Sequence, residues 1–338
     1  RVAKPGAYLL AFGGTRTSHR MACAIEDAGW EIRDTIMWIY GSGFPKSHNG
    51  PWGGTALKPA HEPIIMARKP LIGTVAANVL AHGTGALNID LCRVEWPDGI
   101  APEIGTPSWG GPAKKSTAVP GQDGATVERR PPSQLGRWPA NVIHDGSDEV
   151  LAAFPDAPGQ IANASTNAEA QKTQNAYGAM RRGRGDEPSA DSENTGPVGF
   201  KMRPGDRRLD SGSAARFFYC AKASRKDRNE GLEGMQVFRA GERAGGRAEG
   251  SAGLATAYAG TRTPGQNIHP TVKPTELMRY LVRLVTPPGG TILDPFCGSG
   301  STGKAAVLEW CNFVGIDLES EYTAIAERRI AFAQRQAA

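Results

Sequence analysis

The sequence has few cysteines, no long hydrophobic run and little excess charge, and each shortage excludes a class of protein. Its five cysteines are far apart and none forms a C-x-x-C pair, so neither a disulfide framework nor a zinc site is indicated. No apolar run approaches the roughly 18 residues of a membrane span. The net charge of +5 is compatible with a polyanionic partner but does not require one. We therefore expect a cytoplasmic protein with no membrane segment and no metal.

The middle of the chain also lacks long apolar patterns. Stretches rich in glycine, proline, serine and asparagine cover about 97–136, 156–214 and 239–267. Such stretches bury too little apolar surface to offset the entropy lost on ordering, so we expect long loops or disorder there. Between them, a helix is expected at 74–83, a strand at 137–146 and a short helix at 148–155.

The two ends of the chain are richer in regular patterns. Strands are expected near 8–12, 31–41 and 62–70, with an amphipathic helix at 19–30. The C-terminal part reads as a helix capped by Thr275, then two buried strands that alternate with two helices. Strand, helix, strand, helix predicts parallel strands joined by a right-handed crossover, and hence an α/β fold.

The most informative stretch, at 291–310, is TILDPFCGSGSTGKAAVLEW. Gly298, Gly300 and Gly303 form the G-x-G-x-x-G pattern of dinucleotide-binding loops, and Gly298 to Lys304 nearly matches the triphosphate pattern G-x-x-x-x-G-K. The acid Asp294, just before the glycines, suggests a third ligand, S-adenosylmethionine. Three incompatible ligands therefore have to be separated.

A triphosphate loop needs Ser or Thr after the lysine to hold magnesium, but that position is Ala305, and Asp294 would repel phosphates. A nicotinamide-binding loop fits the glycine spacing, and Asp317 lies where a ribose-binding acid belongs. However, only one more strand and one more helix follow, so the other strands of such a domain would have to come from upstream. A nicotinamide-dependent oxidoreductase remains an alternative.

S-adenosylmethionine accounts for more of these residues. It carries an ammonium and a sulfonium, which a nearby carboxylate attracts. The glycines let the backbone approach its methionine part, and Asp317 can accept hydrogen bonds from both ribose hydroxyls. Either acid alone is commonly a cap or a surface residue. Both acids at consecutive strand ends around a glycine turn favour S-adenosylmethionine.

The motifs HPTVKP (269–274), LDPFCGSGST (293–302) and FVGIDLESEY (313–322) resemble the β-class of DNA amino-methyltransferases, which modify N6 of adenine or N4 of cytosine. Six other stretches are similar to phage and bacterial members of this family: AKPGAYLLAFGGTRT, DTIMWIYGSGFPKSHN, HEPIIMARKP, GALNID, GRWPANVIHDGS and RFFYCAKASRKDRNEGL. In that family the cofactor motifs come last, as here. The resemblance implies a Rossmann-like, circularly permuted fold: one half of the core in 1–70, a loop-rich target-recognition insert in 71–268, and the half that binds S-adenosylmethionine in 269–338.

The resemblance also implies site residues. The methionine and adenosyl parts of the cofactor would be surrounded by Asp294, Phe296, Gly298, Ser299 and Gly300. Asp317 would bind the ribose, and Thr271 and Lys273 would close the other side, although Lys273 could instead be a surface lysine. Cys297 is assigned no role. It lacks the Pro-Cys context of a cysteine nucleophile, so C5-cytosine chemistry is not expected.

The catalytic motif of the family is Asp, Asn or Ser followed by Pro-Pro and an aromatic residue. It would accept hydrogen bonds from the target amine and stack on a base that has left the duplex. None of the 338 residues forms it, so no catalytic residue is assigned. We expect the motif upstream of Arg1, on a strand between 8–12 and 291–296, and expect this chain alone to be inactive and unstable or aggregation-prone.

Double-stranded DNA is the expected partner. A basic island at 201–228 offers Arg225, Lys226 and Arg228 as contacts to phosphates. The aromatic residues 217–219 within it could contact DNA or form a core strand. Trp38 could line the base pocket or belong to the core. A DNA-binding remnant without catalysis is a second alternative.

Overall fold

The computed structural model describes residues 2–41, 43, 50–96, 133–156, 171–175, 178–182, 212–221, 226–237 and 265–337. Contacts divide the chain into two compact units. Unit 1 comprises Arg1–Cys92, Pro139–Ala152 and Phe218–Ala338, and unit 2 comprises Arg93–Trp138 and Ala153–Phe217. Parts of the predicted insert 71–268 thus belong to unit 1. The three-part division of the sequence stays a prediction.

Unit 1 contains a mixed five-stranded sheet with the strand order β1-β3-β2-β4-β7. Its strands are β1 (Tyr8–Phe12), β2 (Glu31–Ile39), β3 (His61–Arg68), β4 (Val142–His144) and β7 (Tyr219–Cys220). Strand β3 pairs antiparallel with β1 and β2, whereas β4 pairs parallel with β2 and β7. From Pro63 to Ala67 every residue of β3 is buried, which explains why this strand reads as a continuous apolar run.

Short helices connect these strands where the sequence predicts them. They are α1 (Ser18–Asp27), α2 (Val75–His82) and α3 (Asp148–Ala153). Helix α2 has both expected end signals: the hydroxyl of Thr74 accepts a hydrogen bond from the Ala77 N–H at 3.2 Å, and Gly83 ends the helix with a φ of 73°.

The C-terminal part of unit 1 forms a parallel two-stranded sheet of β8 (Thr291–Asp294) and β9 (Asn312–Gly315). Helix α5 (Ser301–Leu308) connects them, and α6 (Ser320–Ala337) packs against α5. The prediction that both strands are buried is wrong: Leu293 and Val314 are 45% and 49% exposed. Helix α5 contacts both strands. Among the described residues, β8 pairs only with β9 and β1 only with β3. A further strand between them stays a prediction.

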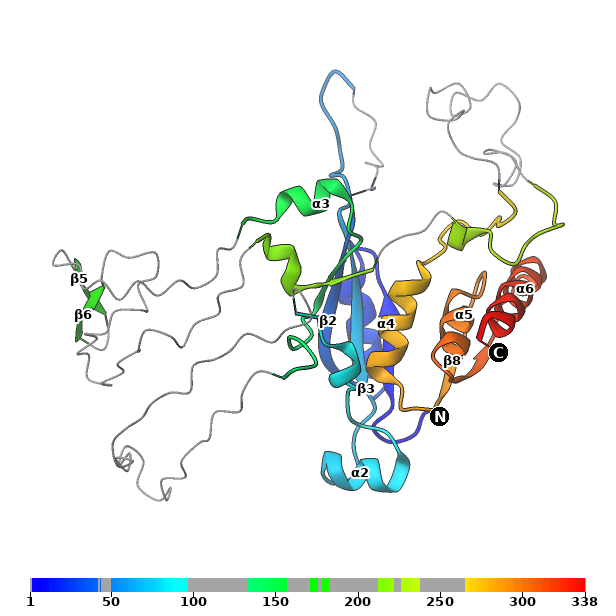
Figure 1. Cartoon of the computed structure of the whole chain (residues 1–338), viewed down its shortest axis with the longest axis horizontal. Coiled ribbons are helices and arrows are strands. Elements are labelled where there is room, and N and C mark those ends of the chain that lie inside the picture. Colours follow the sequence, from blue (N-terminus) through cyan, green and yellow to red (C-terminus); the bar gives the residue numbers. More distant parts are fainter. Residues whose placement is uncertain are drawn as a thin grey trace. The chain divides into compact units, whose positions relative to one another are not determined.

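Helix α4 (Thr275–Val285) joins the two sheets of unit 1 (Figure 1). Its side chains Leu277, Tyr280 and Leu281 are almost fully buried in one core cluster with Ile64 of β3 and Ala305 of α5. Tyr280 also stacks on Tyr219 of β7, with ring centroids 4.1 Å apart, so Tyr219 belongs to the core. The predicted α/β class is confirmed.

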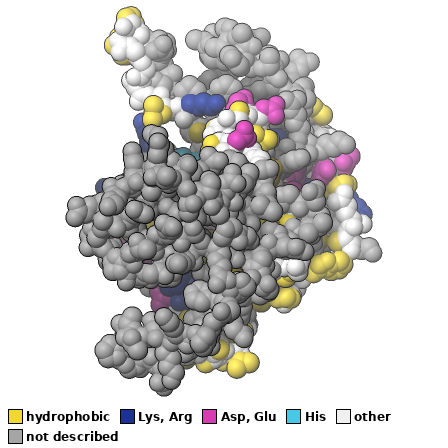
Figure 2. Space-filling model, turned by 60° about the vertical axis from the view of Figure 1, so that its left-hand side comes forward, with side chains coloured by type: hydrophobic (Ala, Val, Ile, Leu, Met, Phe, Trp, Pro, Cys, Tyr) yellow, Lys and Arg dark blue, Asp and Glu magenta, His cyan; other side chains and the backbone are white. Residues whose placement is uncertain are grey.

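Unit 2 contains the hairpin of β5 (Gln171–Asn175) and β6 (Gly178–Arg182), within a stretch for which the sequence predicts only loops. Isolated bridges join Val94 to Arg137 and Asp156 to Ser213. Most of the other predicted loops lie outside the described residues. On the face shown in Figure 2, hydrophobic side chains reach the surface beside basic and acidic ones. None of the helices in the described ranges combines the length and the apolar character that a membrane crossing needs.

Candidate cofactor-binding site

Two acids and a glycine turn meet at the carboxyl ends of β8 and β9. The register pairs Asp294 with Gly315, and the Ile316 N–H donates to the Asp294 carbonyl at 2.9 Å. The turn then bonds back, because the Cys297 N–H donates to the Ile316 carbonyl at 2.9 Å. Carboxyl ends of parallel strands are where open α/β sheets bind ligands. The structure thus brings together the acids that the sequence singled out.

The two carboxylates hold the turn from both sides. Asp294 accepts hydrogen bonds from the Phe296 N–H at 3.1 Å and from the Thr302 hydroxyl at 2.5 Å. Asp317 accepts from the Gly298 N–H at 2.7 Å and from the Glu319 N–H at 3.1 Å. The backbone hydrogen bonds from Glu319 and Gly298 lower the pKa of Asp317, so it is a carboxylate at neutral pH.

Glycine is required at two positions of the turn. Gly298 and Gly300 have φ values of 50° and 76°, in the left-handed region. A Cβ on Gly298 would lie 2.5 Å from Nε2 of His269, and one on Gly300 would lie 2.8 Å from the Cα of Ala326 in α6. The backbone therefore approaches both neighbours closely, while the ring of Phe296 is 87% exposed beside the turn.

His269 is a site residue that the sequence argument missed. Its Nδ1 accepts a hydrogen bond from the Thr271 N–H at 3.3 Å, and its ring meets Tyr322 of α6 edge-on at 4.7 Å. Burial lowers the pKa of His269, although the charge of Asp317 acts in the opposite direction. His269 is therefore neutral and links the predicted residue Thr271 to the glycine turn. Its place at the start of HPTVKP was the available signal.

Lys304, the lysine of the triphosphate-like pattern, lies in a buried ion-pair cluster. Its ammonium is almost fully buried and lies 2.7 Å from both Asp227 and Glu230. Asp227 also accepts hydrogen bonds from the N–H and the hydroxyl of Thr275. The sequence predicted Thr275 as the N-cap of α4, but the structure makes Thr275 the first residue of the helix and Pro274 its N-cap. A lysine held by two carboxylates cannot serve a phosphate chain.

Arg329 of α6 donates hydrogen bonds to the turn, and the sequence analysis did not identify it. Its fully buried guanidinium donates to the Ser299 carbonyl at 2.6 Å, to the hydroxyls of Ser299 and Ser301, and to the Asp227 carbonyl at 3.0 Å. Ser299 is therefore a buried support residue. A charged residue on the apolar face of α6, in register with Ile325 and Ala333, was the sequence signal.

Lys273 contacts a different part of unit 1. Its ammonium pairs with the Glu62 carboxylate of β3 at 2.6 Å and lies 4.7 Å from the ring centroid of Phe12 and 5.6 Å from that of Trp38. Trp38 is partly buried against the core, and its indole nitrogen has no hydrogen-bond partner among the residues that the structure describes. Cofactor binding by Lys273 stays a prediction.

The predicted DNA contacts are only partly described. Arg225 lies outside the described residues, and only the backbone of Lys226 is described, in the 3-10 helix η5 (Lys226–Arg228). The Arg228 guanidinium donates to the carbonyls of Asn267 and His269. It therefore anchors the segment before the cofactor motif, and its contact with DNA stays a prediction.

The chemistry of the turn is electrostatic rather than nucleophilic. Burial, together with the charges of Asp294 and Asp317, raises the pKa of the Cys297 thiol to about 11, so the thiolate is scarce at neutral pH. Two carboxylates, a closely approachable backbone and an exposed phenyl ring suit a ligand that carries positive charge, hydroxyl groups and an aromatic ring. S-adenosylmethionine has all three features.

Comparison with known families agrees with this geometry. Residues 202–328, which include η5, the glycine turn and Asp317, match the DNA methylase family of N6 and N4 methyltransferases. This segment of the chain is therefore similar to the DNA methylase family. The resemblance noted from the motifs is thereby confirmed, and the match does not favour the nicotinamide alternative.

Three curated proteins have segments similar to part of this chain. The putative methylase YubD of Escherichia coli K12 is 38% identical over 76 residues, which cover 22% of this chain and 34% of YubD. The DNA adenine methyltransferase YhdJ of the same organism is 39% identical over 70 residues, which cover 21% of this chain and 24% of YhdJ. The type II methyltransferase M2.DpnII of Streptococcus pneumoniae is 47% identical over 62 residues, which cover 18% of this chain and 23% of M2.DpnII. The chain thus spans about a third or less of the length of these relatives.

Two crystal structures, of M1.HpyAVI and of its complex with SAM, align with 97% of this chain and with 75% and 76% of their own chains. Sequence identities are 12% and 14%, and TM-scores are 0.38 and 0.36. These scores are too low for a residue-by-residue comparison of the sites.

Proposed function

We propose that the protein transfers a methyl group from S-adenosylmethionine to an exocyclic amine of a DNA base. The observation that carries the proposal is the glycine turn between Asp294 and Asp317, within the segment that matches the DNA methylase family. The relative YhdJ is named a DNA adenine methyltransferase, which favours adenine N6 over cytosine N4.

The residues of the turn have separate roles in this proposal. Asp317 accepts hydrogen bonds from the ribose hydroxyls, and the Asp294 carboxylate attracts the positively charged methionine part. The exposed ring of Phe296 packs against the adenine. Gly298 and Gly300 allow the backbone to approach the ligand, while Ser299 is held from behind by Arg329. S-adenosylmethionine, when bound, supplies an electrophilic methyl group.

The buried cluster of Lys304, Asp227 and Glu230 fits this cofactor better than a nucleotide triphosphate. A triphosphate site would need the lysine ammonium free to reach phosphates. With that ammonium neutralised by its own ion pairs, it does not offset the carboxylates of Asp294 and Asp317, which suit a cationic ligand.

A combined binding and transfer experiment tests the proposal. The chain is titrated with S-adenosylmethionine by calorimetry, with and without duplex DNA, and then incubated with methyl-tritiated cofactor and DNA, whose bases are analysed after digestion. The proposal predicts cofactor binding and DNA binding, with any transferred label on an exocyclic amine. Label on any other atom of the bases, or binding of a nicotinamide cofactor alone, contradicts the proposal.

A further inference from the structure

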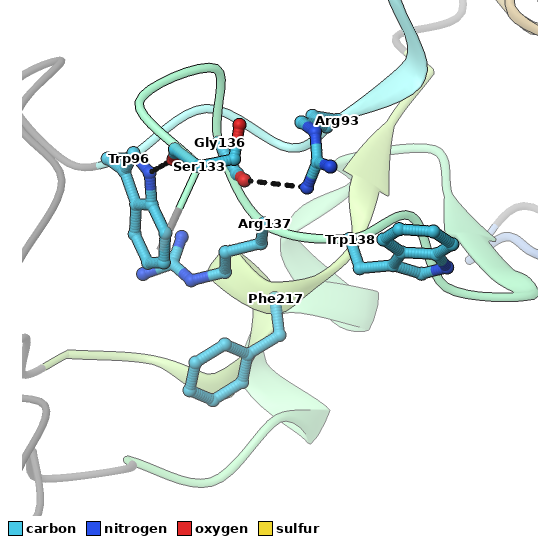
Figure 3. A pocket seen from close by; sticks show the side chains of 7 residues that line it. All are labelled: Arg93, Trp96, Ser133, Gly136, Arg137, Trp138 and Phe217. Atoms are coloured by element: carbon cyan, nitrogen blue, oxygen red, sulfur yellow. Dashed lines mark hydrogen bonds between the residues drawn. The ribbon is translucent and has the colours of Figure 1, made fainter. Parts of the chain in front are cut away.

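Unit 2 contains a cavity of about 480 Å³ that the cofactor site does not use (Figure 3). It is lined by Arg93, Trp96, Ser133, Gly136, Arg137, Trp138 and Phe217. The volume lies within the roughly 300–1,000 Å³ that is usual for pockets that hold small molecules. The described part of the lining combines three aromatic rings and two guanidinium groups, a chemistry that favours a ligand that is flat and negatively charged.

The cavity is built from segments joined by backbone hydrogen bonds. Val94 and Arg137 exchange two of them, at 3.0 and 2.7 Å. The Arg137 guanidinium donates to the carbonyls of Glu95 and Arg216 at 3.2 and 3.1 Å, which ties in the short helix η4 (Ala214–Phe217). These contacts fix the position of the lining before any ligand binds.

A stack of rings and guanidinium groups forms the buried wall. The guanidinium carbon of Arg137 lies 4.6 Å from the ring centroid of Trp96 and 5.2 Å from that of Phe217. The Trp96 indole N–H donates to the Ser133 carbonyl at 2.8 Å (Figure 3). The guanidinium of Arg216 lies 4.3 Å from the centroid of Phe217. Trp96 and Arg137 are each 6% exposed, so this side of the cavity is buried.

The opposite side of the lining is open to solvent. Trp138 is 66% exposed, and the guanidinium carbon of Arg93 lies 5.3 Å from its ring centroid. The Arg93 guanidinium also donates to the Gly136 carbonyl at 3.3 Å (Figure 3). A large aromatic ring left exposed beside a fixed cation contributes little to folding, but it is the arrangement with which proteins stack a nucleobase and hold its phosphate.

We propose that this cavity binds an unstacked or single-stranded nucleotide of the DNA substrate, with Trp138 stacked on the base and Arg93 on a neighbouring phosphate. The proposal rests on the proposed function, which makes DNA the substrate, and it assigns DNA contact to residues outside the basic island 201–228. An acidic segment of a partner protein would present charge but no flat ring for the Trp138 face, so a nucleotide fits the lining better.

The test measures binding of a labelled single-stranded oligonucleotide and of a duplex by fluorescence anisotropy over a series of salt concentrations. The full chain is compared with W138A, W138F and R93Q. Matched controls are W52A, which changes a tryptophan that is 77% exposed in unit 1, and R33Q, which changes an exposed arginine on β2. Circular dichroism melts check that each variant is folded.

The proposal predicts that W138A weakens single-strand binding by about five- to one-hundredfold, the usual effect of losing one stacked base, and that W138F retains most of the affinity. R93Q should lower the slope of log affinity against log salt by about 0.7, as expected for one lost phosphate contact. W52A and R33Q should bind like the wild-type chain.

Other outcomes overturn it in distinguishable ways. If the wild-type chain binds DNA and folded W138A binds equally well, the nucleotide site is wrong and the proposed function stands. If an acidic peptide displaces the oligonucleotide and itself depends on Trp138, the cavity is a protein site. If the wild-type chain binds neither oligonucleotide, the DNA part of the proposed function is contradicted as well.

Discussion

The carboxylate of Asp317 accepts a hydrogen bond from the Gly298 N–H at 2.7 Å, so the acid that follows β9 holds the glycine turn that follows β8. The other oxygen of the same carboxylate accepts from the Glu319 N–H. Asp317 therefore shapes the turn, and in the proposed function it also contacts the ribose. Its substitution should affect both the local structure and the cofactor affinity.

Replacing Asp317 with Asn tests this double role. Both carboxylate oxygens accept backbone N–H groups, and an amide has only one oxygen, so one hydrogen bond to a charged acceptor is lost, worth about 1.5–3 kcal/mol. We expect the affinity for S-adenosylmethionine to fall by at least about tenfold in calorimetric titrations. Glu319→Gln is the control, since only its backbone N–H is used. Equal affinities in D317N and the wild-type chain would remove Asp317 from the site.

Gly298→Ala tests the close approach of the turn to His269. The added Cβ would meet Nε2 of His269 at 2.5 Å in a backbone with positive φ. Gly289→Ala is the matched control, because Gly289 also has positive φ but nothing within 4 Å of its Cβ. We expect G298A to lower the free energy of unfolding by about 1–3 kcal/mol more than G289A in urea titrations. Similar losses in the two variants would show that the turn tolerates the contact.

Lys304→Met separates a structural lysine from a phosphate-binding one. Removing Lys304 leaves the buried Asp227 carboxylate with only the more distant guanidinium of Arg329, 3.8 Å away, among the described cations, and should cost about 3–5 kcal/mol of unfolding free energy. The double variant K304M/D227N should lose less than the sum of the single variants, because the two residues interact directly. A stable K304M variant would contradict the buried cluster.

The pH dependence of stability reports on His269. Burial lowers its pKa in the folded chain, whereas the unfolded chain takes up this proton near about pH 6.5. As the pH falls through that value, the unfolded state binds more protons than the folded state, so the unfolding free energy decreases. Protonation of Nδ1 would also break its hydrogen bond with the Thr271 N–H.

His269→Gln removes this effect. Urea unfolding between about pH 7.5 and about pH 5.5 should show a smaller loss of unfolding free energy in H269Q than in the wild-type chain. His19→Gln, an exposed position in α1, is the control and should keep the wild-type pH dependence. Identical pH profiles for H269Q and the wild-type chain would show that His269 titrates alike in the folded and unfolded states.

Local patterns in the sequence were sufficient for strands β1 to β4, β8 and β9, but not for the hairpin of β5 and β6. Strand β1 was predicted with its observed bounds, and Asp294 and Asp317 could be placed together because parallel strands end at the same edge of a sheet. Interactions between distant residues could not be predicted in this way. Lys273 pairs with Glu62, 211 residues away, and Arg329 reaches Ser299 from the last helix.

Other errors came from burial rather than distance. Strands β8 and β9 have the apolar composition of buried strands, yet Leu293 and Val314 are about half exposed, since composition does not reveal which faces are covered. The sequence did not predict a binding role for Trp138 or Arg93, because the cavity that they line also needs Phe217, which is distant in sequence.

In the proposed function, the turn between Asp294 and Asp317 binds S-adenosylmethionine. The most direct test measures the thermal unfolding midpoint of the wild-type chain and of D317N while each is titrated separately with S-adenosylmethionine, NAD and ATP. We expect the midpoint to rise to saturation with S-adenosylmethionine alone, and to rise less in D317N. A rise with NAD or ATP and none with S-adenosylmethionine would contradict it.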